Sequence, residues 1–329
     1  MKRMTKRLML SAATMAITAS GALAEDVTIG HFGNPTPMQV ARAAGDFDAA
    51  TGWTIEWRQF ASGTDVIAAM ASGDIQVAEL GSSPLAIATS SGVDLQLFML
   101  AQVIGEAESL IVRDGAGIET LEDLRGKRVA VPVGSTAHFS LMGALDQAGI
   151  GEDELTILNM PPDQIAAAWQ QDAIDAAFIW QPVQSQISEN GTLLVGADQT
   201  AEWGFPTFDG WVVNTGFAAD HADGLAAFAA TMDAANGAYL ADPAAWTADS
   251  APVIAIAEQT GADASQVPGI LEGFAFIPLA DQLSPTWLGS AADTMLATAT
   301  FLQSAGRIDA VADEYSGFVS TSIAEAAVQ

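Results

Sequence analysis

Short apolar runs of strand length alternate along the chain with longer alanine-rich stretches in which apolar residues recur at helical spacing. The pattern predicts strands at 27–30, 53–60, 75–80, 128–131, 155–159 and 174–179. It predicts helices at 38–50, 65–71, 85–90, 121–124, 137–148 and 163–170. Because strands and helices alternate, the pattern indicates an α/β protein built from βα units.

The βα pattern runs twice, which indicates two lobes. Two further apolar strands, 110–112 and 211–213, stand at the junctions between the runs, and we interpret each as a crossing between the lobes. A hinge of a few residues at both crossings allows closure around a ligand. The tail from Ala218 onward is mostly helical in pattern and is expected to pack on the first lobe. The expected division is a signal peptide at 1–24, lobe I at 25–110 and 211–329, and lobe II at 111–210.

The first 24 residues differ from the rest of the chain. Four basic residues precede a largely apolar run at 8–19, and the small-residue site Ala22-Leu23-Ala24 follows. This order is typical of a secretory signal peptide and predicts cleavage after Ala24. No later apolar run reaches the ~18 residues needed to span a bilayer. We therefore expect an exported, unanchored, periplasmic product.

Composition narrows the classes of function. The 329 residues include 40 acidic and 11 basic ones, and the formal charge of −29 argues against nucleic acid or a membrane surface as a partner. The absence of cysteine excludes disulfides, thiolate metal sites and a cysteine nucleophile. The common hydrolase, nucleotide and metal motifs are missing, and the three histidines lack the spacing of metal ligands. We expect neither a metal nor a cofactor.

Small hydroxyl or amide residues stand at three strand-to-helix junctions, 33–36, 81–84 and 134–136. The candidate ligand-binding residues there are Asn34, Ser82, Ser83, Ser135 and Thr136. Carboxyl ends of strands in open α/β sheets face a crevice, and free N–H groups at helix starts attract negative charge, so the junctions predict a pocket for a small oxyanion. Ordinary N-capping explains any single junction, but their occurrence in both lobes favours the pocket. Neutral donors without Lys or Arg beside them suit a weakly basic anion better than phosphate.

Carboxylates and aromatic residues are candidates for the rest of the site. Glu108 stands just before one crossing strand and Asp209 just before the other, where they can receive an ammonium group; solvated loop acids are the alternative. Trp180 and Trp211 can wall a ligand and contact a cation through their π faces, or they belong to the core. His138 lies at a helix start, where it either faces the site or only packs.

Several short segments resemble one protein family in order and spacing over nearly all of the chain after residue 24. Leu-Arg-Gly-Lys at 124–127 and Ala-Ser-Gly-Asp at 71–74 resemble the periplasmic solute-binding proteins of ABC importers for aliphatic sulfonates, nitrate, taurine and thiamine precursors. The features that resemble the taurine branch of this family more narrowly are Gly-Ser-Ser-Pro at 81–84, Ser135-Thr136 with His138 close behind, and Asp209 before Trp-Val-Val.

The resemblance implies a two-lobed periplasmic binding protein fold of type II, with the ligand cleft between the lobes and no catalytic turnover. It implies a monomer that binds taurine or a related small sulfonate and delivers it to an ABC transporter permease and its ATPase. The alternative ligand is a simple alkanesulfonate or another small zwitterion. The alternative from a different class is an exported hydrolase that uses His138 with Ser135 or Asp209. Turnover of any substrate would favour that enzyme.

Overall fold

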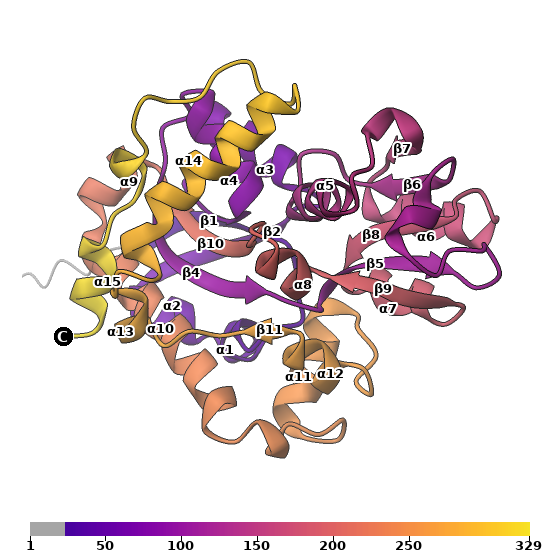
Figure 1. Cartoon of the computed structure of the whole chain (residues 1–329). Coiled ribbons are helices and arrows are strands. Elements are labelled where there is room, and N and C mark those ends of the chain that lie inside the picture. The colour runs from indigo at the N-terminus through magenta and orange to yellow at the C-terminus, as the bar shows by residue number, and fades with distance from the viewer. Residues whose placement is uncertain (1–23) are drawn as a thin grey trace, which may run out of the picture.

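Two β-sheets flanked by helices lie side by side in the computed structural model, which describes residues 24–329 (Figure 1). Except for Ala24, the predicted signal peptide lies outside these residues. None of the helices within 24–329 combines the length and hydropathy that crossing a bilayer requires.

The first sheet has six strands in the order β11-β4-β10-β3-β1-β2. Their bounds are Glu25–His31 for β1, Trp53–Gln59 for β2, Val77–Gly81 for β3, Gln96–Ile104 for β4, Phe208–Val213 for β10 and Phe274–Ala275 for β11. Strand β1 pairs in parallel with β2 and β3, whereas β10 is antiparallel to both β3 and β4.

Helices cover both faces of the first sheet (Figure 1). On one face lie α3 (Gly63–Ser72), α4 (Ser82–Ser90) and α14 (Leu288–Ser304). On the other lie α1 (Met38–Ala44), α2 (Asp46–Thr51) and α10 (Ala222–Ala241). Because both faces are covered, strand β3 is buried along its whole length, which explains its continuous apolar character.

The second sheet has five strands in the order β7-β6-β8-β5-β9. Their bounds are Glu108–Arg113 for β5, Arg128–Val131 for β6, Thr156–Asn159 for β7, Ala176–Trp180 for β8 and Gly191–Gly196 for β9. Helices α5 (Thr136–Ala148) and α8 (Ala197–Glu202) lie on one side, and α6 (Pro162–Gln170) and α7 (Val183–Ser188) on the other. Successive side chains of β5 alternate between these layers, since Leu110 and Val112 pack with the α5 cluster and Ile111 with the α6 and α7 cluster.

Both sheets share one strand order. In the first sheet β2, β1 and β3 are neighbours and parallel, and in the second sheet β7, β6 and β8 are. In each sheet the next strand arrives from the other lobe and runs antiparallel to these three. This arriving strand is β10 in the first sheet and β5 in the second. The amino end of this antiparallel strand therefore lies at the same sheet edge as the carboxyl ends of the parallel strands beside it. Functional side chains from both kinds of end are thus brought together.

The chain passes between the sheets at 105–107, which joins β4 to β5, and at 203–207, which joins α8 to β10. Strand β5 belongs wholly to the second sheet and β10 wholly to the first. The exact lobe boundaries given above remain a prediction.

The remaining helices are α9 (Thr215–Asp220), α11 (Ala251–Thr260), α12 (Val267–Glu272), α13 (Leu279–Gln282) and α15 (Ser322–Ala327), with short 3₁₀ turns η1 (Leu121–Leu124), η2 (Glu152–Glu154), η3 (Pro243–Ala245) and η4 (Ser316–Phe318).

The structure corrects two parts of the predicted pattern. The single helix expected at 38–50 is two helices, because Gly45 adopts a left-handed conformation with φ 76° that ends α1 before α2 begins. Strands β4, β9 and the two-residue β11 were not predicted. Nearly all of β4 is buried, so its sequence shows no alternation of apolar and polar residues that would mark it as a strand.

Candidate functional site

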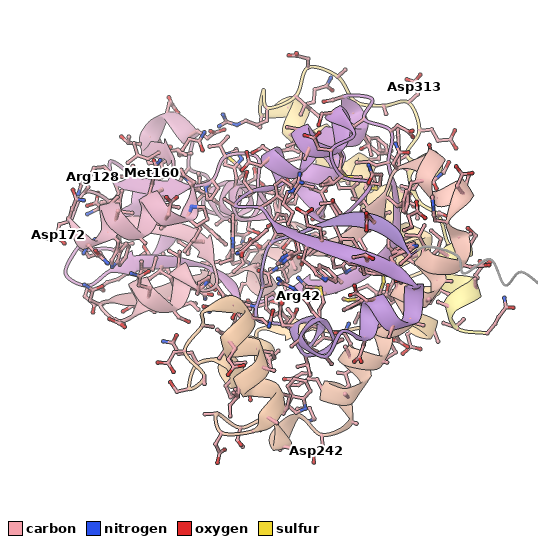
Figure 2. All side chains as sticks on the ribbon, turned by 180° about the vertical axis from the view of Figure 1, so that it is seen from behind. Arg42, Arg128, Met160, Asp172, Asp242 and Asp313 are labelled. Carbon is pink, nitrogen blue, oxygen red and sulfur yellow. The ribbon has the colours of Figure 1, made fainter. Side chains whose placement is uncertain are left out.

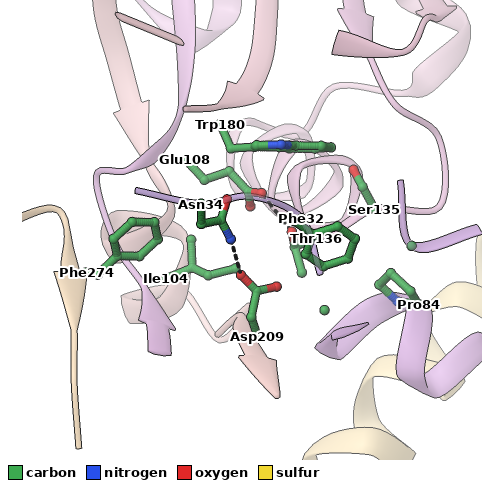
Figure 3. A pocket seen from close by; sticks show the side chains of 12 residues that line it. Phe32, Asn34, Pro84, Ile104, Glu108, Ser135, Thr136, Trp180, Asp209 and Phe274 are labelled. Atoms are coloured by element: carbon green, nitrogen blue, oxygen red, sulfur yellow. Dashed lines mark hydrogen bonds between the residues drawn. The ribbon is translucent and has the colours of Figure 1, made fainter. Parts of the chain in front are cut away.

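A pocket lies where the facing edges of the two sheets meet (Figure 3). It holds about 430 Å³ of space free of protein atoms, including space open to solvent. Both sheets contribute to its lining, which consists of Phe32, Asn34, Gly63, Gly81, Pro84, Ile104, Glu108, Ser135, Thr136, Trp180, Asp209 and Phe274.

Six of the ten residues that the sequence nominated line this pocket. They are Asn34, Glu108, Ser135, Thr136, Trp180 and Asp209. Topology explains the convergence of the two nominated acids. Glu108 begins β5 opposite Trp180 at the carboxyl end of β8, and Asp209 stands near the start of β10 opposite Gly81 at the carboxyl end of β3.

Four nominated residues do not line the pocket. Trp211 is fully buried in the core, with its ring centroid 4.9 Å from that of Phe228. Ser82 Oγ accepts a hydrogen bond from the Phe208 N–H at 3.3 Å, so it holds β10 against the start of α4. Ser83 Oγ is buried with no hydrogen-bond partner among residues 24–329.

His138 is the fourth residue off the pocket. Its ring is fully buried, and Nδ1 accepts a hydrogen bond from the Gly134 N–H at 3.4 Å. Burial, with a smaller contribution from the charge of Arg307, lowers the pKa of His138 to about 4. The side chain is therefore a neutral packing residue beneath the start of α5.

One end of the pocket is formed by helix starts. The first residues of α3, α4 and α5 place Gly63, Pro84 and Thr136 along the lining. The first N–H groups of a helix have no intrahelical acceptor, and the helix dipole adds partial positive charge there. The starts of three helices, each of nine or more residues, thus meet at one region. This end of the pocket suits a small anion.

Two hydroxyl groups at the start of α5 have different tasks. Ser135 Oγ accepts the His138 N–H at 3.2 Å, so it caps the helix and keeps its own proton available to donate. Thr136 Oγ1 donates to Glu108 Oε2 at 2.7 Å and so supports the carboxylate. Of the two, Ser135 is therefore the hydroxyl with a free proton for an anion.

Three buried carboxyl groups, Glu79, Glu108 and Asp209, gather next to the helix starts. Two side-chain amides bridge the first and last of these. Gln102 Nε2 donates to Glu79 Oε1 at 3.0 Å and to Asp209 Oδ2 at 2.8 Å, and Asn34 Nδ2 donates to the same two atoms at 3.2 and 3.4 Å. Glu108 Oε1 is buried with no hydrogen-bond partner within the described chain. An acceptor is therefore left open in the pocket wall.

No basic residue lines the pocket to balance these acids. The described chain carries seven, namely Arg42, Arg58, Arg113, Arg125, Lys127, Arg128 and Arg307. Four of them, from Arg113 to Arg128, belong to the second lobe, and Figure 2 shows Arg128 at its outer end together with Asp172. Arg128 pairs there with Asp175 at 2.7 Å. Among the described residues, the carboxyl end of the pocket thus has no cation of its own, and it has an open carboxyl oxygen to receive one.

Sequence reasoning missed six residues of this region: Phe32, Gly63, Glu79, Gln102, Ile104 and Phe274. Gly63 follows Ser62 and precedes Thr64, so its junction has the same composition as the three nominated ones and could have been found. Glu79 is an acid within a buried strand, which is itself a signal of function. Phe274 lies in a two-residue strand within a helical tail and gives no such signal.

The surroundings of the three buried carboxyl groups raise the pKa of each. Burial raises the pKa of Glu108 to about 8 and outweighs the hydrogen bond from Thr136. Burial, together with the charges of Glu79 and Glu108, raises the pKa of Asp209 well above its ordinary value. Burial also raises the pKa of Glu79, although this group accepts three hydrogen bonds. A cation in the pocket would favour loss of these protons.

These shifts predict how the stability of the ligand-free protein varies with pH. Because the folded pKa of Glu108 lies above its unfolded value, the folded state binds more protons, and stability falls as pH rises towards 8. His31 and His138 act oppositely, because burial lowers each pKa to about 4, and the stability that they add with rising pH levels off about one pH unit above the ordinary histidine value of 6.5. Between pH 6.5 and 8 we expect loss of the Glu108 proton to lower the free energy of unfolding by about 2 kcal/mol, and the two histidines to offset a smaller part of this.

Urea unfolding at half-unit steps of pH checks this expectation. Glu108→Gln should flatten the decline, because the amide has no proton to lose. Asp242→Asn, at an exposed position, is the matched control and should leave the slope unchanged. Stability that stays level or rises between pH 6.5 and 8 would contradict the raised pKa of Glu108.

The pocket has no evident place for a metal. Within residues 24–329, no group of three or more His, Cys, Asp and Glu side chains is arranged to hold a metal ion.

Comparison with known proteins gives consistent matches. The chain is 37% identical over 309 residues to a taurine-binding periplasmic protein of Escherichia coli K12, covering 94% of this chain and 96% of that one. Its fold is similar to the alkanesulfonate-binding protein of Xanthomonas axonopodis pv. citri bound to MOPS, with a TM-score of 0.76, 21% identity and coverage of 91% and 99% of the two chains.

A desulfurization enzyme has a similar fold as well, with a TM-score of 0.66, 15% identity and coverage of 92% and 99% of the chains. At these identities the solved structures show the fold alone, which is the two-lobed α/β fold of periplasmic sulfonate-binding proteins. The family model described as NMT1/THI5 like matches residues 32–245. The chain therefore belongs to the NMT1/THI5-like family.

Proposed function

We propose that this protein is a periplasmic solute-binding protein that encloses taurine between its lobes and passes it to the permease of an ABC importer, which is coupled to an ATPase. The observation that carries the proposal is that three helix starts, which offer donors, and the buried carboxyl groups of Glu108 and Asp209, which offer acceptors, line the same pocket, with Glu79 joined to Asp209 by two bridging amides. A small zwitterion is the ligand class that satisfies both ends.

The sulfonate of taurine fits the end formed by the helix starts. It is tetrahedral, permanently ionised and a weak acceptor, so several neutral donors suit it better than one guanidinium. In our proposal the N–H groups at the starts of α3, α4 and α5 and the Ser135 hydroxyl bind its three oxygens. No basic residue from the described chain is needed there.

The ammonium group, two carbons away, fits the carboxyl end. Glu108 Oε1 is buried and unpartnered within the described chain, and Asp209 lines the same wall. The faces of Phe32 and Trp180, which also line the pocket, suit a cation next to them. Asn34, nominated as a ligand contact, acts in this proposal by holding Asp209 and Glu79 in place.

The carboxyl groups argue against a simple alkanesulfonate as the natural ligand. Such a ligand brings a negative charge and no cation into a site with three buried acids, so the acids must stay protonated or repel it. The resemblance to the alkanesulfonate-binding protein concerns the fold and does not offset this chemistry.

Catalysis is not part of the proposed function, although an enzyme shares the fold. The chain has no cysteine. Ser135 Oγ accepts a hydrogen bond from the backbone N–H of His138, while the buried ring of His138 bonds Gly134. A nucleophile activated by a histidine base needs a hydrogen bond between those two side chains. This arrangement supports binding without turnover.

Calorimetric titration tests the proposal directly. We expect taurine to bind with one site per chain, and ethanesulfonate to bind at least about tenfold more weakly, because it leaves the buried carboxyl groups without a cation. β-Alanine should also bind more weakly, since a planar carboxylate cannot meet three sets of donors. Ethanesulfonate binding as tightly as taurine would reject the proposed role of the carboxyl groups, and sulfite release from taurine by the purified protein would reject the binding-protein function.

A further inference from the structure

One wall of the pocket comes from a segment far along the chain. Strand β11 supplies Phe274, which is paired across the sheet with Ile104 of β4, and both side chains line the pocket. The carbonyl oxygen of Gly273 accepts the N–H groups of Gly105 and Ala107 at 3.1 and 3.2 Å. Backbone hydrogen bonds thus attach this segment to the link between the sheets and hold the backbone next to Phe274 in place.

Figure 3 shows where this wall lies relative to the charged groups. Phe274 and Ile104 are on one side of Glu108 and Asp209, whereas Ser135 is on the opposite side. A ligand with its anion at the helix starts and its ammonium at the carboxyl groups therefore has Phe274 behind its nitrogen.

The wall offers hydrocarbon where the neighbouring groups offer acceptors. A primary ammonium directs its N–H bonds to acceptors, and Glu108 Oε1 and the Asp209 carboxylate stand beside this position. Phe274 and Ile104 have no acceptor, and Ile104 is only 4% exposed, so it has little room to move away. In this orientation a third carbon in the chain, or a methyl group on the nitrogen, points towards Phe274 and Ile104.

We propose that Phe274 is a specificity-determining residue that limits the cationic end of the ligand to a primary amine two carbons from the anion. This inference rests on the proposed function, because it takes the orientation of an amino sulfonate from it. Steric selection by Phe274 thus adds to the electrostatic selection of the ammonium group by the carboxyl groups.

The test measures the affinities of taurine, N-methyltaurine and 3-aminopropanesulfonate for the full chain by calorimetry. The wild-type protein should favour taurine over each analogue by about tenfold or more, as expected when a filled pocket rejects one extra methylene. Phe274→Ala should raise the affinity for both analogues relative to taurine by about tenfold. The affinity ratios of Phe274→Leu should lie between those of the wild-type protein and those of Phe274→Ala. Phe217→Ala removes a similarly half-buried ring outside the pocket and should leave the ratios unchanged.

The outcomes separate this inference from the proposed function. If the wild-type protein does not bind taurine, the proposed function fails and this inference fails with it. If taurine binds but the analogues bind equally well, or if Phe274→Ala leaves the ratios unchanged, only the role of Phe274 is rejected. Equal weakening of all three ligands by Phe274→Ala would mean that the ring supports the link at 105–107 rather than selecting the ligand.

Discussion

Replacing Asp209 by asparagine is expected to weaken taurine binding by about 2 to 4 kcal/mol, roughly 30- to 1,000-fold, because it leaves a desolvated ammonium with one carboxylate fewer. Ethanesulfonate should bind as before or more tightly, since it brings no cation for Asp209 to pair with and asparagine cannot repel its sulfonate. The measurement is the ratio of the two affinities. A general loss of stability changes both affinities together and cannot move this ratio.

Asp242→Asn is the control for this substitution, because Asp242 is exposed and lies at the far end of α10 (Figure 2). It should change neither affinity. If Asp209→Asn weakens both ligands equally, Asp209 serves to hold Asn34 and Gln102 in place, and Glu108, with its open Oε1, is the main partner of the ammonium.

Replacing Gly81 by alanine should weaken every ligand alike. A Cβ atom at Gly81 would lie 2.8 Å from Thr136 Cγ2, which belongs to the other lobe, and 3.3 Å from Asp209 Oδ1. The backbone at Gly81 is extended with φ −69°, so alanine is accepted there without strain and the cost falls on the contact between lobes. We expect a loss of about 1 to 3 kcal/mol, roughly 5- to 150-fold, from this overpacking.

Calorimetry with taurine and ethanesulfonate, combined with thermal unfolding of the ligand-free protein, checks the effect of Gly81→Ala. Gly237→Ala is the matched control, because a Cβ at that glycine of α10 meets nothing within 4 Å. Unchanged affinities in Gly81→Ala would show that the lobes do not approach each other at Thr136 when a ligand is bound. A change in the affinity ratio would contradict a purely steric effect.

The fold was largely predictable because its βα units carry local signals. The strand at 128–131 and the helices at 121–124 and 163–170 need only the periodicity of apolar positions and short capping motifs. Strand β4 was not predictable in the same way, because its burial follows from helices α13, α14 and α15, which come almost 200 residues later in the chain.

The site was predictable where function depends on residues next to strand ends. Asp209 and Glu108 precede apolar strands, and an acid in that position stands out in the sequence. The bridging amide of Gln102 did not stand out, because its role depends on the pairing of β4 with β10, which places it opposite Asp209. Trp211 was nominated as an aromatic residue close to Asp209 at a crossing strand, but its position within β10 directs it into the core. Long-range pairing, which local patterns do not contain, decides these cases.

The strand that each lobe receives from the other has a consequence for the order of folding. All strands of the second sheet fall within 108–196, so that sheet can assemble from one continuous segment. The first sheet cannot, because β10 lies between β3 and β4 and is reached only after the whole second sheet has been made. Until then, β3 and β4 present unpaired apolar edges, which are the usual sites of aggregation. A truncation that ends before residue 208 should therefore give a soluble second lobe attached to an aggregation-prone first one.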